Sequence, residues 1–258
     1  IRDRGSSQRL LRVMLEPLQT GELQALLQSL RVEGLDAERL APALARHCGG
    51  NPLFTLETLR HLLRDGAPAG GELPLPSSVE DALLHRLNAL SDSARALVRV
   101  AAVAGADFGA ELAADVLSQP IMALAEPLAE LEQAQIFRQA GFAHEAVLDV
   151  ARHDVPPPLR SALHARIAAG MAQRGAPAAR VAAHWADAGE WRRAGLAARD
   201  AAVQAQRVGA VAERAELLRQ ASGWFDAAQD AALHFEVDLA RIDACMATDG
   251  VQPALDFA

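Results

Sequence analysis

The sequence predicts a mainly α fold, and its composition is the first reason. Hydrophobic residues make up 51% of the 258 residues, which is enough to bury a core in more than one compact unit. Aromatic residues account for only 4%, tyrosine is absent, and alanine, leucine, arginine and glutamate are abundant. Because alanine and unbranched side chains lose least conformational freedom on entering a helix, this composition favours helices.

Apolar residues at helical spacing and helix-capping residues are the second reason. Apolar positions at Val79, Leu83, Leu87 and Leu90 predict one buried helix face, preceded by a capping signal at residues 78–81. Ser91 is expected to cap the next helix, which Gly105 is expected to end. Further on, Ile136-Phe137 and Phe142 predict a minimal β-hairpin, the only strand signal of this region.

From the prolines at 156–158 onward, the chain predicts one helix after another. Glycines are expected to punctuate these helices near residues 175, 189, 209 and 223, and small residues such as Ala197, Ala201 and Ala205 would let helices pack closely. The pattern is typical of helical repeats, although the full repeat signature of about 34 residues is missing. An ordinary helical bundle is the alternative interpretation.

The most informative segment is Gly49-Gly50-Asn51-Pro52-Leu53-Phe54, with Glu57 one turn later. Glycine closes a helix without a Cβ penalty, so the helix ending at Cys48 should stop here. Asn51 is a good N-cap and Pro52 suits the first helical position, so a second helix should start at once. Leu53, Leu56, Leu59 and Leu63 are expected to give that helix a buried stripe, and Glu57 is expected to pair with Arg60 or His61. Pro42 should kink the preceding helix or mark its start.

Charge and cysteine content exclude some classes of function. The net charge is −8 and lysine is absent, so the chain lacks the concentrated positive charge of a general nucleic-acid surface. The two cysteines, Cys48 and Cys245, do not form a disulfide framework, which indicates a reducing cytoplasm. No segment resembles a membrane span or a secretion signal, and we expect a fragment of a longer polypeptide from the way the sequence begins and ends.

Three ordered blocks resemble the STAND class of signal-transduction ATPases, especially the large ATP-binding LuxR-type regulators and the ATPase modules of some bacterial cyclases and kinases. The first block is the Gly50-Asn51-Pro52-Leu53-Phe54-x-x-Glu57 segment. The second runs over residues 75–108 and resembles the opening of the winged-helix domain of that class. The third, Phe142-Ala143-His144-Glu145-x-Val147, resembles its end. The wing itself is shorter than is usual there, since only residues 138–141 separate its apolar halves.

The resemblance implies a division of the chain into five segments. These are the end of a nucleotide-binding core (1–16), a helical lid (17–66), a linker (67–74), a winged-helix-like domain (75–153) and TPR-like helical repeats (154–258). The run at residues 10–15 is too short for periodicity to distinguish strand from helix. By the same resemblance, the repeats would bind a protein or a small-molecule inducer, and the lid would work with an upstream nucleotide-binding domain.

The resemblance also implies candidate nucleotide-binding residues. Pro52, with Asn51 beside it, would touch the adenine of the nucleotide, and His144 would lie near the diphosphate; otherwise Pro52 is only a helix start and His144 a surface or core-edge residue. With no lysine, a phosphate-binding loop of the Gly-x-x-x-x-Gly-Lys type is impossible here. We therefore expect no catalysis and no tight cofactor binding by this chain alone, whereas the full-length protein would bind ATP or ADP with Mg and possess ATPase capacity.

Other constellations are absent from the sequence, and two other functions stay open. His144-Glu145 lacks the second histidine of a zinc-protease motif, and there is no metal-ligand spacing and no Gly-x-Ser-x-Gly elbow. The expected function is the regulatory part of a bacterial STAND-type regulator, coupling nucleotide state to inducer sensing and transcriptional control. The alternative is a nucleotide-independent scaffold of helical repeats. A DNA-binding winged helix is weaker, because residues 121–131 carry Glu126 and Glu130 and no arginine.

Overall fold

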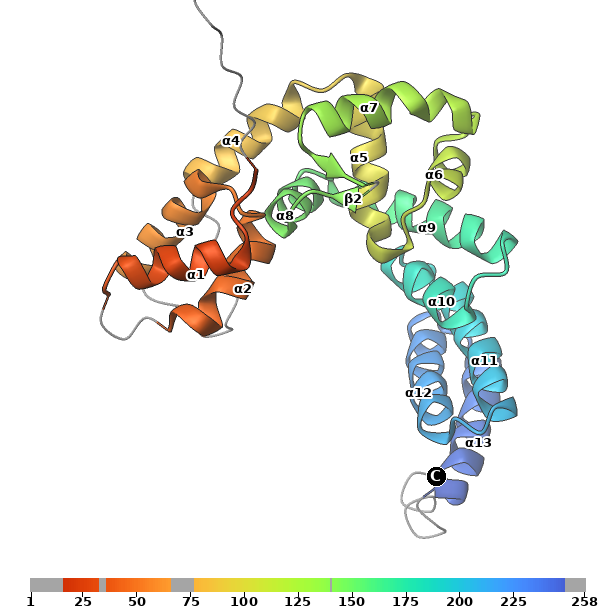
Figure 1. The fold of residues 1–258 in the computed structure, drawn as a ribbon. Helices are drawn as coiled ribbons and strands as arrows, with labels where there is room; N and C mark the ends of the chain where they lie inside the picture. Colours follow the sequence, from red (N-terminus) through yellow and green to blue (C-terminus); the bar gives the residue numbers. More distant parts are fainter. Residues whose placement is uncertain (1–15, 33–35, 66–76, 140, 249–258) are drawn as a thin grey trace, which may run out of the picture. The chain divides into compact units, whose positions relative to one another are not determined.

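The computed structural model describes residues 16–32, 36–65, 77–139 and 141–248, and most of them are helical (Figure 1). Thirteen α-helices, two 3₁₀ helices and one two-stranded sheet account for the secondary structure of these residues, which confirms the mainly α prediction. The expected segments 1–16 and 67–74 lie outside the described residues, apart from Glu16. The chain divides into two compact units, the first containing residues up to Leu83 with Ala143–Val147, the second containing Leu84–Phe142 and the residues from Leu148 onward.

Three helices form most of the first unit: α1 (Thr20–Ser29), α2 (Ala37–Cys48) and α3 (Pro52–Asp65). Asp36 begins α2, because its carboxylate accepts the N–H of Arg39 at 3.0 Å. Pro42 therefore lies inside α2 and does not mark its start. The core of the unit consists of fully buried leucines together with Phe54; the leucines are Leu23, Leu27, Leu44 and Leu59.

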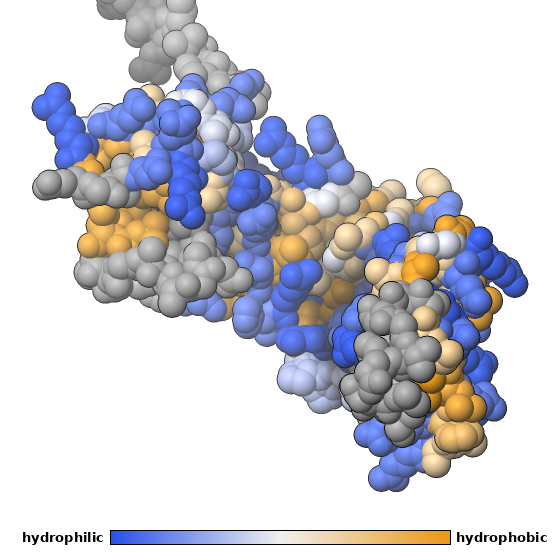
Figure 2. All heavy atoms as spheres, turned by 90° about the horizontal axis from the view of Figure 1, so that it is seen from below, coloured by the Kyte–Doolittle hydropathy of each residue, from blue (hydrophilic) through white to orange (hydrophobic). Residues whose placement is uncertain are grey.

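The face that α3 buries differs from the prediction. Leu59 is buried as expected, but Leu53, Leu56 and Leu63 are 60%, 37% and 49% exposed. The buried face instead carries Phe54, Thr55, Thr58 and Leu59. Leucine spacing misled the prediction because two threonines, Thr55 and Thr58, take buried positions, where the Thr58 hydroxyl accepts the thiol of Cys48. Figure 2 shows hydrophobic side chains gathered on the surface of this unit, at the left.

The second unit begins with short helices around a small hairpin. Its elements, two of which continue from the first unit, are α4 (Ser77–Asn88), α5 (Asp92–Ala104), the 3₁₀ turns η1 (Gly105–Asp107) and η2 (Ile121–Leu124), α6 (Ala110–Leu117), α7 (Ala125–Gln133), β1 (Phe137–Arg138), β2 (Gly141–Phe142) and α8 (Glu145–His153). The strands pair antiparallel, with Phe137 opposite Phe142, so the predicted minimal hairpin is confirmed. The Phe137 ring contacts the edges of Phe108 and Phe142 at centroid distances of 5.7 and 5.0 Å.

The predicted ends of α5 are also confirmed. Ser91 accepts the N–H of Ala94 at 3.2 Å and so begins α5, and Gly105, with φ +56°, ends it. The side chains expected on one face of the preceding helix, Val79, Leu83, Leu87 and Leu90, are at most 6% exposed. The periodicity and the caps of α5 are therefore confirmed, whereas Ser78, expected to cap the preceding helix, lies inside α4, which begins at Ser77.

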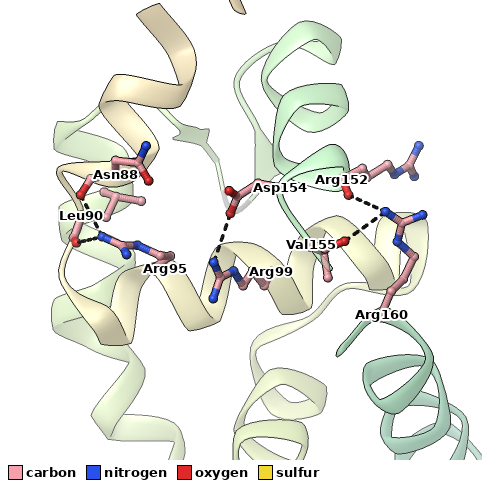
Figure 3. Close-up of polar contacts among 8 residues, drawn as sticks. All are labelled: Asn88, Leu90, Arg95, Arg99, Arg152, Asp154, Val155 and Arg160. Atoms are coloured by element: carbon pink, nitrogen blue, oxygen red, sulfur yellow. Dashed lines mark hydrogen bonds and ion pairs between the residues drawn. The ribbon is translucent and has the colours of Figure 1, made fainter. Parts of the chain in front are cut away.

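Arginine side chains close the helix ends of the second unit (Figure 3). Arg95 donates to the carbonyl oxygens of Asn88 and Leu90 at 2.8 and 3.1 Å, and Arg160 donates to those of Arg152 and Val155 at 3.0 and 3.1 Å. The last carbonyls of a helix have no partner within it, so a guanidinium fork satisfies them. Arg95 and Arg160 therefore fix the turns that follow α4 and α8.

The remaining helices pack each against the next. They are α9 (Pro157–Gln173), α10 (Ala178–Asp187), α11 (Trp191–Arg207), α12 (Val211–Ala227) and α13 (Ala231–Thr248), and Figure 1 shows them following one another. The starts of α9 and α11 are separated by one tetratricopeptide period, roughly 34 residues. Gly175, Gly189 and Gly209 lie after helix ends in the left-handed conformation, as the sequence predicts. Gly223, by contrast, lies inside α12, so it does not punctuate the chain.

Candidate functional site

The candidate site is the corner between α2 and α3 in the first unit. Gly49 and Gly50 both have left-handed backbones, with φ +57° and +71°, and they end α2. The N–H of Asn51 then donates to the carbonyl oxygen of Cys48 at 3.0 Å. Pro52 is the first residue of α3 and is exposed. The chain therefore passes from α2 to α3 through three residues, and Pro52 lies at the surface.

Asn51 closes the start of α3. Its side-chain oxygen accepts the N–H groups of Leu53 and Phe54 at 3.0 and 3.3 Å, and its carbonyl oxygen accepts the N–H of Thr55 at 2.9 Å. The first amides of a helix are its anion-binding groups, and here two of them are already satisfied. Since proline has no N–H, this helix start offers a nucleotide an apolar ring and not a phosphate site.

The segment before α1 also holds the corner in place. The N–H of Leu18 donates to the carbonyl oxygen of Gly50 at 2.9 Å. A Cβ atom at residue 50 would overlap the carbonyl oxygen of Leu18, so this position needs glycine for space as well as for its φ. Gly50 thus ties the corner to the N-terminal side of the first unit.

His144 packs onto the same corner. A Cβ atom at residue 49 would overlap the imidazole ring, so the absence of a side chain at Gly49 makes room for His144. The ring is half-buried, and the residue directly precedes α8, where its carbonyl oxygen accepts the N–H of Val147 at 3.1 Å. The structure therefore places His144 against Gly49, which precedes Asn51 and Pro52 by two and three residues in the sequence.

Neighbouring polar groups of the corner do not form a catalytic constellation. The thiol of Cys48 donates to the Thr58 hydroxyl at 3.6 Å, and burial raises the pKa of this thiol, although hydrogen bonds to Thr58 and Thr55 lower it. A protonated, buried thiol is a poor nucleophile. Glu57 bonds to Arg60, as the sequence predicts. Arg46 and Glu145, both exposed, lie 4.0 Å apart, a pair that contributes little to stability.

Sequence reasoning identified three members of this corner and missed two. The sequence points to Pro52, Asn51 and His144 by resemblance, whereas it explains Gly49 only as a helix end and does not point to Leu18. The sequence contains one signal for these missed contacts. A single glycine suffices to end a helix, yet two glycines, Gly49 and Gly50, follow α2. The second glycine is explained by tertiary contacts, which helix-ending rules do not contain.

Comparison with known proteins identifies no relative. No protein-family model, no curated protein and no solved structure matches the chain. Within the described part of the chain, no three histidine, cysteine, aspartate or glutamate side chains are grouped so that they can hold a metal ion. None of the helices that the structure describes combines the length and apolarity needed to cross a membrane.

Proposed function

We propose that this chain is the regulatory portion of a bacterial STAND-type signal-transduction ATPase, which couples nucleotide state to the sensing of a partner or inducer and to transcriptional control. The observation that carries the proposal is the packing of His144 onto Gly49 at the Pro52 corner. Two residues distant in sequence, each selected for a nucleotide-sensing role, lie at one corner of the first unit. A shared nucleotide contact requires such proximity.

The chemistry of the corner suits the sensing role. Pro52 offers an exposed apolar ring for an adenine, while the Asn51 side chain is occupied by holding the helix start. His144 is a half-buried imidazole, whose ring N–H can donate to a phosphate oxygen nearby. ATP or ADP, with Mg, is the proposed cofactor of the full-length protein, and the phosphate-binding groups belong to an upstream domain.

The exposed side of α3 is the proposed contact for that upstream nucleotide-binding domain. Leu53, Leu56 and Leu63 follow Pro52 on this helix and are exposed. Apolar side chains gathered at a surface are typical of an interface. A domain that holds the nucleotide against Pro52 would cover these leucines, so nucleotide exchange would change how this helix packs.

The helices from α9 to α13 are the proposed sensor. Each contacts its neighbours in sequence, the arrangement by which repeat proteins display an extended surface to a partner or inducer. Direct DNA binding by this segment is not part of the proposal. The helix α7 carries Glu126 and Glu130 and no arginine, and Glu130 is engaged by Ser91. The alternative function is a scaffold of helical repeats that binds protein without a nucleotide.

Nucleotide titration of the full-length protein separates these two functions. We expect saturable binding of both ADP and ATP. We also expect the amides of α3 to be protected from hydrogen exchange to different extents in the ADP-bound and the ATP-bound protein. The scaffold alternative predicts that neither nucleotide binds, and it also predicts that the gene sequence preceding Ile1 encodes no phosphate-binding loop. Either result would remove the basis for the regulatory assignment.

A further inference from the structure

A second site lies within the second unit and shares no residue with the Pro52 corner. A pocket of about 340 Å³ opens beside the C-terminal end of α5 and is lined by residues 102–106 and by five polar residues. These are Arg152, Arg160, His164, His184 and Asp187. The volume is at the lower end of small-molecule sites, roughly 300–1,000 Å³. Two guanidiniums against one carboxylate leave this lining positive while both imidazoles are neutral.

Both arginines are fixed by main-chain contacts and still have donors to spare. Nε of Arg152 donates to the carbonyl oxygen of Ala102 at 3.1 Å, and its guanidinium lies against Gly105, where a Cβ atom would be 3.2 Å from Nη2. Arg160 uses Nη2 for the carbonyl oxygens of Arg152 and Val155 (Figure 3). A guanidinium has five N–H donors in a fork that fits an oxyanion, so each side chain is held in place with donors remaining.

The two histidines form a hydrogen-bonded chain with one assignable arrangement of protons. His184 Nε2 lies 3.1 Å from the Asp107 carboxylate, so this nitrogen carries a proton. Its Nδ1 therefore accepts, and His164 Nδ1, 2.8 Å away, donates. Protonation of His184 at Nδ1 would bring two N–H groups face to face. The pair can take up one proton without losing this bond, at Nε2 of His164.

The other charged groups around the pair are mostly engaged with each other. Asp107 of η1 pairs with Arg180 of α10 as well as with His184, and Arg99 of α5 pairs with Asp154 at 3.2 Å. Asp187, whose side chain is 63% exposed, lies 3.7 Å from Nδ1 of His164. Burial lowers the pKa of His164, Asp187 raises it, and Arg160 one turn away lowers it again. Burial likewise lowers the pKa of His184.

We propose that this pocket binds a small oxyanion, a carboxylate or phosphate group held by Arg152 and Arg160, and that binding is accompanied by uptake of one proton at His164. The anion replaces the exposed Asp187 carboxylate as the negative partner of the imidazolium. Because residues of α5, α8, α9 and α10 all line the pocket, a bound anion would link these four helices where the series from α9 to α13 begins. This site is independent of the nucleotide function proposed above.

The test is an NMR titration of the histidine side chains in the complete 258-residue chain. Inorganic phosphate and acetate are added in separate arms at constant ionic strength, with chloride as the reference anion. We expect at least one oxyanion to shift the His164 and His184 resonances saturably, and to do so more tightly at pH 6 than at pH 8. The preferred arm distinguishes a phosphate from a carboxylate ligand. No saturable shift in either arm, or identical affinity at both pH values, would overturn the proposal.

Matched variants separate binding from a merely structural role. Arg160→Gln should weaken binding at least tenfold, whereas Arg219→Gln on α12, far along the chain, should leave it unchanged. Asp187→Asn should tighten binding severalfold at pH 6, since it removes the competing carboxylate, and a structural role predicts no such gain. Helix content measured by circular dichroism checks folding; if Arg160→Gln unfolds, the Asp187→Asn result decides, and equal or weaker binding there contradicts the proposal.

Discussion

The imidazole of His144 lies in the space that a side chain at residue 49 would occupy. This relationship joins the end of α2 to the residue that precedes α8, although the two are far apart in sequence. Residue 49 therefore requires glycine for two reasons. Its backbone is left-handed, and the imidazole of His144 leaves no space for a Cβ atom.

Substitution of Gly49 should therefore cost more than its backbone conformation alone. In Gly49→Ala the left-handed φ costs roughly 1–2 kcal/mol, and displacement of His144 adds to it. Gly209→Ala is the matched control, because Gly209 has φ +72° and no atom within 4 Å of its Cβ position. Denaturant unfolding should show a larger loss for Gly49→Ala, and His144→Ala should remove the excess in a double-mutant cycle. Equal losses at the two glycines would argue against the contact.

Gly195 and Gly223 should respond to alanine in opposite directions. A Cβ atom at Gly195 would lie 2.7 Å from the buried Phe225 ring, so Gly195→Ala forces α11 and α12 apart and should destabilise by about 1–3 kcal/mol. Gly223 is exposed inside α12 with no atom near its Cβ position, so Gly223→Ala should stabilise by about 0.5–1 kcal/mol. Thermal unfolding of both variants measures this. A destabilised Gly223→Ala protein would contradict the helix assignment at this residue.

The histidine pair should make stability fall in mild acid. Burial lowers the pKa of His164 and of His184 below the ordinary value of 6.5, so between these values the unfolded chain binds more protons than the folded one. The associated stability is present above pH 6.5 and is lost as the pH falls below it. Urea unfolding at pH 7.5 and 5.5 should show a smaller difference for His184→Asn than for the parent chain. An unchanged difference would mean that these imidazoles are not buried together.

Glu130 should contribute to the stability of the fold in a lower pH range than the histidine pair does. Ser91 donates its backbone N–H and its hydroxyl to this carboxylate at 2.7 and 2.5 Å, and these hydrogen bonds lower the pKa of Glu130 below its ordinary 4.5. Its contribution is then present above pH 4.5 and is lost as the pH falls through the folded pKa. Glu130→Gln should unfold more easily than the parent at pH 7 and equally easily near pH 2. The exposed Glu132→Gln on the same helix is the control and should match the parent at both.

Local signals predicted the fold better than the site. Ser91, Gly105, Asn51 and the hairpin at Phe137 and Phe142 were predictable because caps, turns and strand pairs depend on residues close in sequence. The exposed leucines of α3 were not, since burial depends on partners elsewhere in the chain. For the same reason, Pro52 and His144 can be selected from the sequence only by resemblance. Nothing in the sequence indicates that the imidazole of His144 packs against Gly49.

The pocket beside α5 was not predictable either. His164 and His184 are on different helices, and their spacing along the chain matches no metal or catalytic motif. Only the packing of α9 on α10, with Asp107 of η1 behind them, brings the two rings within hydrogen-bonding distance. Isolated histidines in a sequence carry no such information.

The most direct measurement of the central claim is the affinity of the full-length protein for ADP and ATP after single substitutions at the corner. We expect Pro52→Ala to weaken both nucleotides, through lost apolar contact. His144→Ala should change their ratio about tenfold or more, the scale of one hydrogen bond to a charged group. His153→Ala, an exposed histidine at the end of α8, is the control and should have no effect. Affinities that stay the same in both corner variants, in a protein that binds nucleotide, would contradict the claim that this corner senses it.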